Sequence, residues 1–250
     1  MPDDPKTADP FAHHPELRDL IKDPLTSRFR ELSLDHVRML MDEHGLQGGW
    51  WYSNEEREAL RAAFMPELTG GDLWVFGYGS LMTDPGLLFA EVRRATLPRH
   101  ARKFILRDEN GARGRPEAPG LMAALDTAGD EDVCEGLAFR IRAELVEQET
   151  EILWRREMIA PGYHATIVPA RIGGLDVPVL AFLADHDADV IVTDISRAEQ
   201  IQMIATGKGF FGSSQEYLEN IDRQFAALGI VDPEVADLLR DVRTHAAPSH

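Results

Sequence analysis

The chain has 250 residues, of which 44% are hydrophobic and 28% charged, and its formal net charge is −17 at pH 7. This composition is typical of a globular protein with a sizeable core and argues against a disordered chain. The acidic excess repels phosphate backbones and anionic lipid surfaces, so we expect neither a nucleic-acid nor a membrane partner.

Cysteine content and hydropathy indicate the compartment. Cys134 is the only cysteine, so no intramolecular disulfide can form and a secreted scaffold is disfavoured. The first ten residues have neither a basic nor an apolar region of the kind found in signal peptides. The longest strongly apolar run, residues 179–184, is far shorter than the roughly 20 residues of a membrane-spanning helix. We therefore expect a cytoplasmic protein.

The chain begins with residues 1–30, which are rich in Asp, Pro, His and Lys and lack amphipathic periodicity. We interpret them as a mobile or loosely docked lead-in whose deletion leaves a folded, active protein. Residues 34–44 then place Val37, Leu40 and Met41 at helical spacing and predict a helix.

A second helix is predicted over residues 53–64. Ser53 and Glu56 have the spacing of a capping box, and a Met-Pro pair and a Gly-Gly pair follow the helix and end it. Trp50 and the two aromatic residues after it precede the cap, and we interpret them as packing residues of the core or of a domain boundary.

Strand patterns dominate the middle of the chain, at residues 73–76, 103–106, 121–125 and 133–141. Gly136 lies inside the last of these and is interpreted as the site of a bulge. Two further runs, joined by Gly-Gly, predict a hairpin over residues 163–172 and 175–184. Pro169 and Pro178 within them predict edge positions or bulges.

Helical patterns occupy residues 145–158 and most of the last sixty residues, over 196–205, 213–228 and 233–243. Ser213 and Glu216 again form a capping-box pair, and Asp232 followed by Pro233 supplies an N-cap and a proline at the first helical position. Strands followed by helices predict an α+β fold with a largely antiparallel sheet or a small barrel.

The segment 75–82 runs from a strand into a turn, with glycines on both sides of Tyr78. Such glycines let backbone N–H groups converge on an anion or a carbonyl oxygen, although a plain turn explains the local pattern equally simply. Met82 replaces the third glycine of a dinucleotide fingerprint, so that function is not expected. Ser80 lacks the G-x-S-x-G frame of a serine hydrolase.

Two arginines, Arg113 and Arg115, lie in a loop over residues 113–120 that contains two prolines and two glycines. A fixed loop of this kind could present a guanidinium to a substrate carboxylate, and a solvated surface loop is the alternative.

Glu157 lies in the last turn of a predicted helix. The negative end of the helix dipole raises the pKa of a carboxylate placed there, which suits a general base. The alternative is a structural glutamate that pairs with Arg155 or Arg156 or points into water.

Other polar patterns predict no bound cofactor. The glycine-rich segment 207–214 precedes a helix but lacks the spacing of a phosphate loop, so nucleotide binding is not favoured. The nine histidines and one cysteine show no metal-site spacing, so we expect no metal. The basic residues between positions 93 and 103 fit a solvated strand face.

Taken together, five segments resemble the ChaC family of glutathione-specific γ-glutamylcyclotransferases. They are Phe-Gly-Tyr-Gly-Ser-Leu at 76–81, Arg-Gly-Arg-Pro-Glu-Ala-Pro-Gly at 113–120, Cys-Glu-Gly-Leu-Ala at 134–138, Leu-Trp-Arg-Arg-Glu-Met at 153–158 and Gly-Ser-Ser-Gln-Glu-Tyr-Leu at 212–218. Their order and spacing match the family over about residues 72–243. One departure is Thr-Asp-Pro at 83–85, where many members carry Trp after the loop.

The resemblance implies a γ-glutamylcyclotransferase-like fold, a small mixed or antiparallel β-barrel with flanking helices and a helical C-terminal part. We expect a lead-in over residues 1–30, a helical extension over 31–71 and a catalytic domain over 72–245. Glu157 matches the catalytic glutamate of the family. The expected substrate-binding residues are Phe76, Gly77, Tyr78, Gly79, Ser80, Leu81, Arg115 and Tyr217.

The implied reaction is cleavage of glutathione to 5-oxoproline and cysteinylglycine, without metal or cofactor. Two alternatives stay open at this point. One is action on another γ-glutamyl amine or peptide, and the other is a non-catalytic ligand-binding protein. Glu157 argues against the second, because a binding module does not need a carboxylate there.

Overall fold

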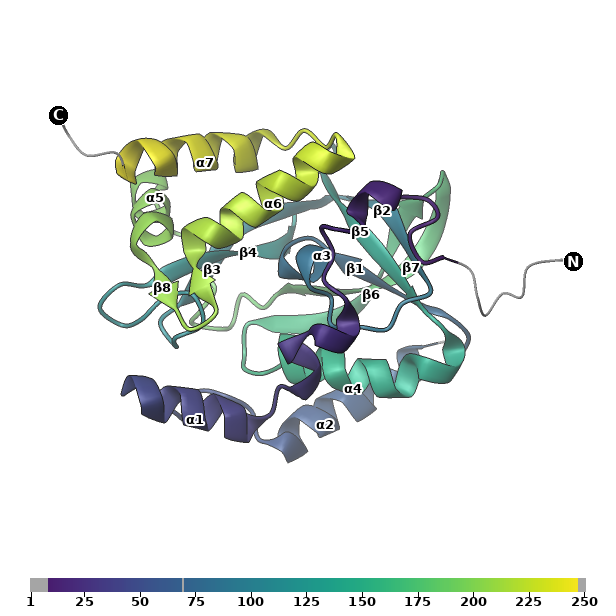
Figure 1. The fold of residues 1–250 in the computed structure, drawn as a ribbon, viewed down its shortest axis with the longest axis horizontal. Helices are drawn as coiled ribbons and strands as arrows, with labels where there is room; N and C mark the ends of the chain where they lie inside the picture. Colours follow the sequence, from purple (N-terminus) through teal and green to yellow (C-terminus); the bar gives the residue numbers. More distant parts are fainter. Residues whose placement is uncertain (1–8, 69, 247–250) are drawn as a thin grey trace, which may run out of the picture.

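The computed structural model describes residues 9–68 and 70–246, and its centre is a mixed β-barrel (Figure 1). The main sheet has seven strands in the order β1-β5-β2-β6-β7-β4-β3, and a parallel contact between β1 and β7 closes the first five into a barrel. The strands are β1 (Leu73–Gly77), β2 (Glu91–Pro98), β3 (His100–Asp108), β4 (Gly120–Thr127), β5 (Val133–Ile141), β6 (Tyr163–Ile172) and β7 (Leu175–Ala184).

Helices flank the barrel on two sides. In Figure 1, α5, α6 and α7 lie together above the strands, and α1, α2 and α4 lie below them. The helices are α1 (Leu34–His44), α2 (Asn54–Phe64), α3 (Ser80–Thr83), α4 (Val146–Glu157), α5 (Arg197–Thr206), α6 (Ser214–Leu228) and α7 (Pro233–Ala246). Five 3-10 turns are η1 (Pro15–Leu17), η2 (Pro24–Thr26), η3 (Arg28–Glu31), η4 (Met65–Glu67) and η5 (Ala143–Leu145). A two-residue ladder joins β8 (Lys208–Gly209) to β9 (Gly212–Ser213).

The α+β fold and each helix and strand range predicted from the sequence are confirmed to within a few residues. Both predicted capping boxes are present, since Ser53 and Ser213 accept from the third helical N–H while the glutamate there accepts from the cap. Local hydrogen bonding of this kind depends only on residues close in sequence, so the pattern alone predicts it.

The bulge predicted at Gly136 is absent, because β5 keeps an unbroken register with both β1 and β2. The glycine serves close packing instead. A Cβ atom there would lie 2.3 Å from the carbonyl oxygen of Gly77. The shift of register falls between Phe104 and Leu106, where β3 pairs with β4. Pro169 and Pro178 face each other across β6 and β7 in an unbroken register, so neither marks a bulge.

Residues 9–30 are closely docked, which corrects the expectation of a mobile or loosely docked lead-in; residues 1–8 lie outside the described residues. Leu17 is fully buried and Ile21 is 5% exposed, both within the main hydrophobic core. The N–H of Lys22 donates to the carbonyl of Thr83 at 2.8 Å, directly after α3. Helical periodicity misses such a segment, because it consists of short 3-10 turns with isolated apolar anchors.

The core also fixes the end of α4. The Trp154 ring packs at 5.3 Å from Phe64 of α2 and at 5.4 Å from Phe182 of β7. This contact holds the last turn of α4 against the barrel, so the residue that ends the helix has a defined position.

Among the helices of the described residues, none has both the length and the apolar character needed to cross a membrane.

Candidate active site

A cavity of about 220 Å³ lies where the loop after β1 meets the end of α4. The turn between β3 and β4, the start of β6 and helix α6 complete its polar side. The polar and small residues that line it include Tyr78, Gly79, Ser80, Arg113, Arg156, Glu157, Tyr163 and Tyr217.

The loop after β1 is tightly fixed. The Tyr78 carbonyl accepts a hydrogen bond from Nε of Arg102 at 2.5 Å, and Arg102 is itself only 5% exposed. A Cβ atom on Gly79 would lie 2.5 Å from the hydroxyl of Tyr217, so only glycine fits between this loop and α6. Of the six residues expected here, the cavity is lined by Tyr78, Gly79, Ser80 and Leu81.

The other two, Phe76 and Gly77, belong to β1 and stay behind the cavity wall. Phe76 is fully buried in the core. A Cβ atom on Gly77 would lie 3.1 Å from the Leu81 side chain and 3.3 Å from the Phe139 ring. Both residues therefore support the loop from behind.

Glu157 ends α4 and lines the cavity, with a side chain that is 12% exposed. Burial raises the pKa of this carboxyl above its ordinary value, while the neighbouring Arg156 guanidinium opposes the shift. Nε of Arg156 lies 2.8 Å from Oε1, but that buried oxygen has no hydrogen-bond partner of proper geometry. Glu157 is thus a buried carboxylate that is ion-paired with Arg156 at Oε1 and faces the cavity.

Arg156 connects this carboxylate with the loop after β1. Its Nη2 donates to Oγ of Ser80 at 2.9 Å, and its guanidinium lies 4.0 Å from the centre of the Phe29 ring. From the sequence, Arg156 was expected only as an ion-pair partner in the structural alternative for Glu157. Its contact with Ser80 depends on the approach of α4 to the loop, which no local pattern reveals.

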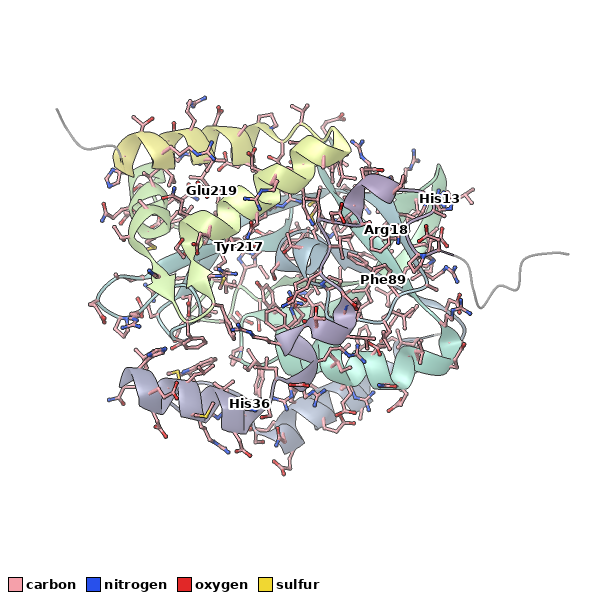
Figure 2. The ribbon with its side chains drawn as sticks, in the orientation of Figure 1. His13, Arg18, His36, Phe89, Tyr217 and Glu219 are labelled. Atoms are coloured by element: carbon pink, nitrogen blue, oxygen red, sulfur yellow. The ribbon has the colours of Figure 1, made fainter. Side chains whose placement is uncertain are left out.

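Three tyrosine hydroxyls contribute to the cavity. Burial raises the pKa of Tyr78 and Tyr163, whose side chains are hydrogen-bonded to one another, and raises that of Tyr217 to about 12. All three hydroxyls therefore stay protonated at neutral pH and can donate hydrogen bonds. Figure 2 shows Tyr217 on α6. Tyr78 and Tyr217 were both expected to bind the substrate. Tyr163 was not predicted as a site residue. It follows the Ala-Pro-Gly segment that comes after α4.

Of the two arginines in the predicted loop, Arg113 lines the cavity and Arg115 lies outside the lining. Asp108 shapes this turn, because its carboxylate accepts from the backbone N–H groups of Arg113, Gly114 and Asn110. The Arg113 guanidinium lies 5.7 Å from the centre of the Tyr217 ring. Arg115 exchanges two backbone hydrogen bonds of 3.0 Å with Ala118 at the tip of the loop.

The remaining wall of the cavity is apolar. Phe29, Leu32, Val37 and Trp50 come from the segment before the barrel, and Phe210 and Phe211 come from the turn between β8 and β9. The glycine-rich segment 207–214 therefore places aromatic side chains beside the cavity, through backbone bonds from its two phenylalanines to Gly111 and Ala112.

In the described part of the chain, no cluster of three or more His, Cys, Asp or Glu side chains could hold a metal ion.

Comparisons with known proteins identify the family of this chain. The family model described as ChaC-like protein matches residues 73–245. A glutathione-specific γ-glutamylcyclotransferase of Escherichia coli K12 is 34% identical over 195 residues, which cover 77% of this chain and 82% of that protein. A glutathione-specific γ-glutamylcyclotransferase 1 of Danio rerio is 31% identical over 150 residues, covering 58% of this chain and 75% of that protein.

Among solved structures, a γ-glutamyl cyclotransferase specific to glutathione from yeast has a similar fold. The TM-score is 0.63 at 21% identity, and the match covers 70% of this chain and all of the other. At this identity the likeness concerns the fold.

Proposed function

Because this chain belongs to the ChaC-like protein family, we propose that it is a γ-glutamylcyclotransferase that cleaves glutathione to 5-oxoproline and cysteinylglycine. The observation that carries the proposal is Glu157, a buried carboxylate with a raised pKa that lines the cavity beside the loop of residues 78–81. We assign the reaction to a catalytic domain over residues 72–245. The single cysteine supports a cytoplasmic protein, and the acidic composition supports the absence of a nucleic-acid partner.

The proposed reaction is an intramolecular ring closure. The α-amine of the glutamyl unit attacks its own γ-carbonyl carbon, a C–N bond forms, and the bond from that carbon to the leaving nitrogen breaks. Holding the two reacting groups in the correct orientation can lower such a barrier by up to about 7–11 kcal/mol. The main task of the cavity is therefore to hold the glutamyl unit in a bent conformation.

A single base is enough for proton transfer if it passes on each proton that it accepts. The α-ammonium nitrogen loses two protons during the reaction and the leaving nitrogen gains two. Glu157 can carry each of them across and finish in its starting state. Because burial raises its pKa, this carboxylate is a stronger base than an exposed glutamate.

Charge that develops on the γ-carbonyl oxygen needs hydrogen-bond donors. The first N–H groups of a helix have no partner within it, so the N–H groups of Ser80 and Leu81 at the start of α3 are available. The protonated hydroxyls of Tyr78 and Tyr217 offer two further donors. We assign Arg113 to the α-carboxylate of the substrate, because it is the partly buried cation on the α6 side of the cavity.

The proposal is tested by incubating the purified protein with three peptides and identifying products by mass spectrometry. Glutathione should give 5-oxoproline and cysteinylglycine. N-acetyl-glutathione lacks the nucleophilic amine, and α-glutamyl-cysteinyl-glycine cannot close the same ring onto the leaving amine, so neither should react. Free glutamate as the main product, or cleavage of the acetylated peptide, would replace cyclisation by amide hydrolysis.

A further inference from the structure

One wall of the cavity comes from a part of the chain that precedes the matched family segment. The family model begins at residue 73. Four lining residues come before it, and we call them the N-terminal wall: Phe29, Leu32, Val37 and Trp50. They belong to an apolar cluster that also contains Met41, Leu46, Trp51, Ile159, Phe210 and Phe211.

The N-terminal wall is held rigidly against the barrel. Arg30 forms two hydrogen bonds of 2.7 and 3.0 Å with the carboxylate of Glu149 on α4, and it also donates to the carbonyl of Gly86 at 3.0 Å. Glu149 is completely buried and accepts a further bond from the N–H of Leu88. A bidentate, buried contact of this kind fixes both distance and orientation.

The wall begins beside the proposed base. The Phe29 ring covers the guanidinium of Arg156, next to Glu157, at 4.0 Å. The N–H of Tyr52 donates to the carbonyl of Ile159 at 2.9 Å, two residues after Glu157. Figure 1 shows α1, which carries Val37, on the side of the barrel opposite α6.

The two ends of a γ-glutamyl substrate can therefore be placed. The charged glutamyl half requires the polar side, formed by Arg113 and Tyr217 near α6. The reacting carbonyl must lie near Glu157, so the leaving half extends toward the N-terminal wall.

Trp50 supplies a second, independent observation. It lines the cavity, and its indole Nε1 is buried without a hydrogen-bond partner. An indole nitrogen can only donate, and buried donors in native proteins are nearly always paired. Because Trp50 lines the cavity, a bound substrate can supply the acceptor that this N–H lacks.

We propose that Trp50 determines specificity by donating its indole N–H to an oxygen of the leaving half, a peptide carbonyl or a carboxylate, while the rest of the N-terminal wall packs on that half. The substrate class is then a γ-glutamyl peptide, and a γ-glutamyl alkylamine lacks the required acceptor. This inference rests on the proposed function for the orientation of the substrate.

The experiment measures binding in a protein that does not turn over. In the Glu157→Gln background, calorimetry gives the Kd of glutathione and of γ-glutamylethylamide, which shares the glutamyl half but has no oxygen in its leaving half. Trp50→Phe keeps an aromatic ring and removes the N–H. We expect it to raise the Kd of glutathione about tenfold, the range of one lost hydrogen bond, and to leave that of γ-glutamylethylamide within about twofold.

The matched control is Trp51→Phe. Trp51 belongs to the same cluster, with its ring 5.2 Å from that of Trp50, but it does not line the cavity. We expect both Kd values to stay within about twofold of the parent. If γ-glutamylethylamide binds too weakly to measure, the glutathione values of the two tryptophan variants decide the question.

Three results would overturn the proposal: an equal rise for both ligands, no rise for glutathione, or no binding of glutathione to the Glu157→Gln protein. Glutathione binding without 5-oxoproline formation by the wild type would defeat the proposed function alone, and the role of Trp50 would still be decided by the Kd values. Should Trp50→Phe fail to fold, the indole resonances of the Glu157→Gln protein give the answer by NMR. One of the four must shift with glutathione and stay in place with γ-glutamylethylamide.

Discussion

The carboxylate of Glu157 lies where water has little access. Because this burial changes its pKa, the pH dependence of activity is a direct test of its role. Burial raises its pKa, so the folded protein holds the proton more tightly than the unfolded chain. A base must be ionised to work. The acid limb of kcat/KM for glutathione should therefore have its midpoint above the ordinary glutamate value of 4.5.

Glu157→Gln should lower kcat for glutathione by about a hundredfold or more, while glutathione binding is largely kept. The same variant has a pH signature in stability. The raised pKa contributes stability that is present below pH 4.5 and is lost as the pH rises through the folded pKa. The Tm of Glu157→Gln relative to wild type should therefore increase from pH 4 to pH 7. Turnover within a few-fold of wild type would remove Glu157 from the mechanism.

Arg113 and Arg115 form a natural pair for comparison, because they are two residues apart and only Arg113 lines the cavity. Arg113→Gln should raise the KM for glutathione by about ten- to hundredfold, as expected for the loss of a charged hydrogen bond, with a smaller change in kcat. Arg115→Gln should leave both constants within about twofold. Steady-state kinetics of both variants shows which arginine binds the substrate. A larger rise in KM for Arg115→Gln than for Arg113→Gln would identify Arg115 as the ligand.

The contact between Gly79 and Tyr217 can be tested by a double-mutant cycle. Gly79→Ala places a methyl group 2.5 Å from the Tyr217 hydroxyl but 3.5 Å from its ring carbon Cζ. The single variant should lose at least about 1–3 kcal/mol of unfolding free energy through overpacking. Adding Tyr217→Phe removes the oxygen and should recover most of that loss. Additive losses in chemical denaturation would show that the loop, and not the tyrosine, excludes the methyl group.

At the scale of elements, the end of the lead-in is fixed by an ion pair between Arg30 and the fully buried Glu149. Arg30→Ala leaves a buried carboxylate without its cation, so unfolding free energy should fall by about 3–5 kcal/mol. Arg38→Ala, which removes an exposed pair with Asp35, is the control and should change it by less than about 1 kcal/mol. Urea denaturation measures both, and equal small effects would mean that the lead-in is only loosely attached.

The sequence predicts those elements whose cause is local. The capping boxes at Ser53 and Ser213, the strand runs and the hairpin over residues 163–184 follow from neighbouring residues alone. The docking of residues 9–30 could not be predicted, because Leu17 and Ile21 are buried by partners far along the chain.

The site divides in the same way. Glu157 could be proposed from its helix end, and the loop of residues 78–81 from its glycines. Arg102 was expected on a solvated strand face, but it is buried and holds the Tyr78 carbonyl. A further partner of Arg102, Asp232, is 130 residues away in sequence, and Trp50 reaches the cavity from before the barrel. Contacts of such range are set by topology, which single-sequence patterns do not encode.

At the scale of the whole molecule, the net charge of −17 acts on a substrate that carries two carboxylates and one ammonium group. At about 0.01 M ionic strength the screening length, roughly 30 Å, approaches molecular dimensions, and the total charge repels glutathione. At about 0.15 M the screening length falls to roughly 8 Å, and glutathione then interacts only with the arginines of the cavity. We expect kcat/KM to rise about two- to fivefold between these conditions.

The control for this salt effect is γ-glutamylethylamide, whose charges cancel. Its kcat/KM, or its Kd in the Glu157→Gln protein, should be almost independent of ionic strength. A fall of kcat/KM for glutathione with added salt would mean that the local field of the cavity is positive and outweighs the total charge.

The continuity of the N-terminal wall in the chain has a consequence for evolution. All four of its residues lie between positions 29 and 50, whereas the base, the loop and the tyrosines lie between 78 and 217. Recombination or drift in one short stretch can therefore change which leaving groups are accepted without disturbing ring closure. Variants of the four wall residues should therefore differ in their preference for leaving groups, while the residues assigned to ring closure keep their places.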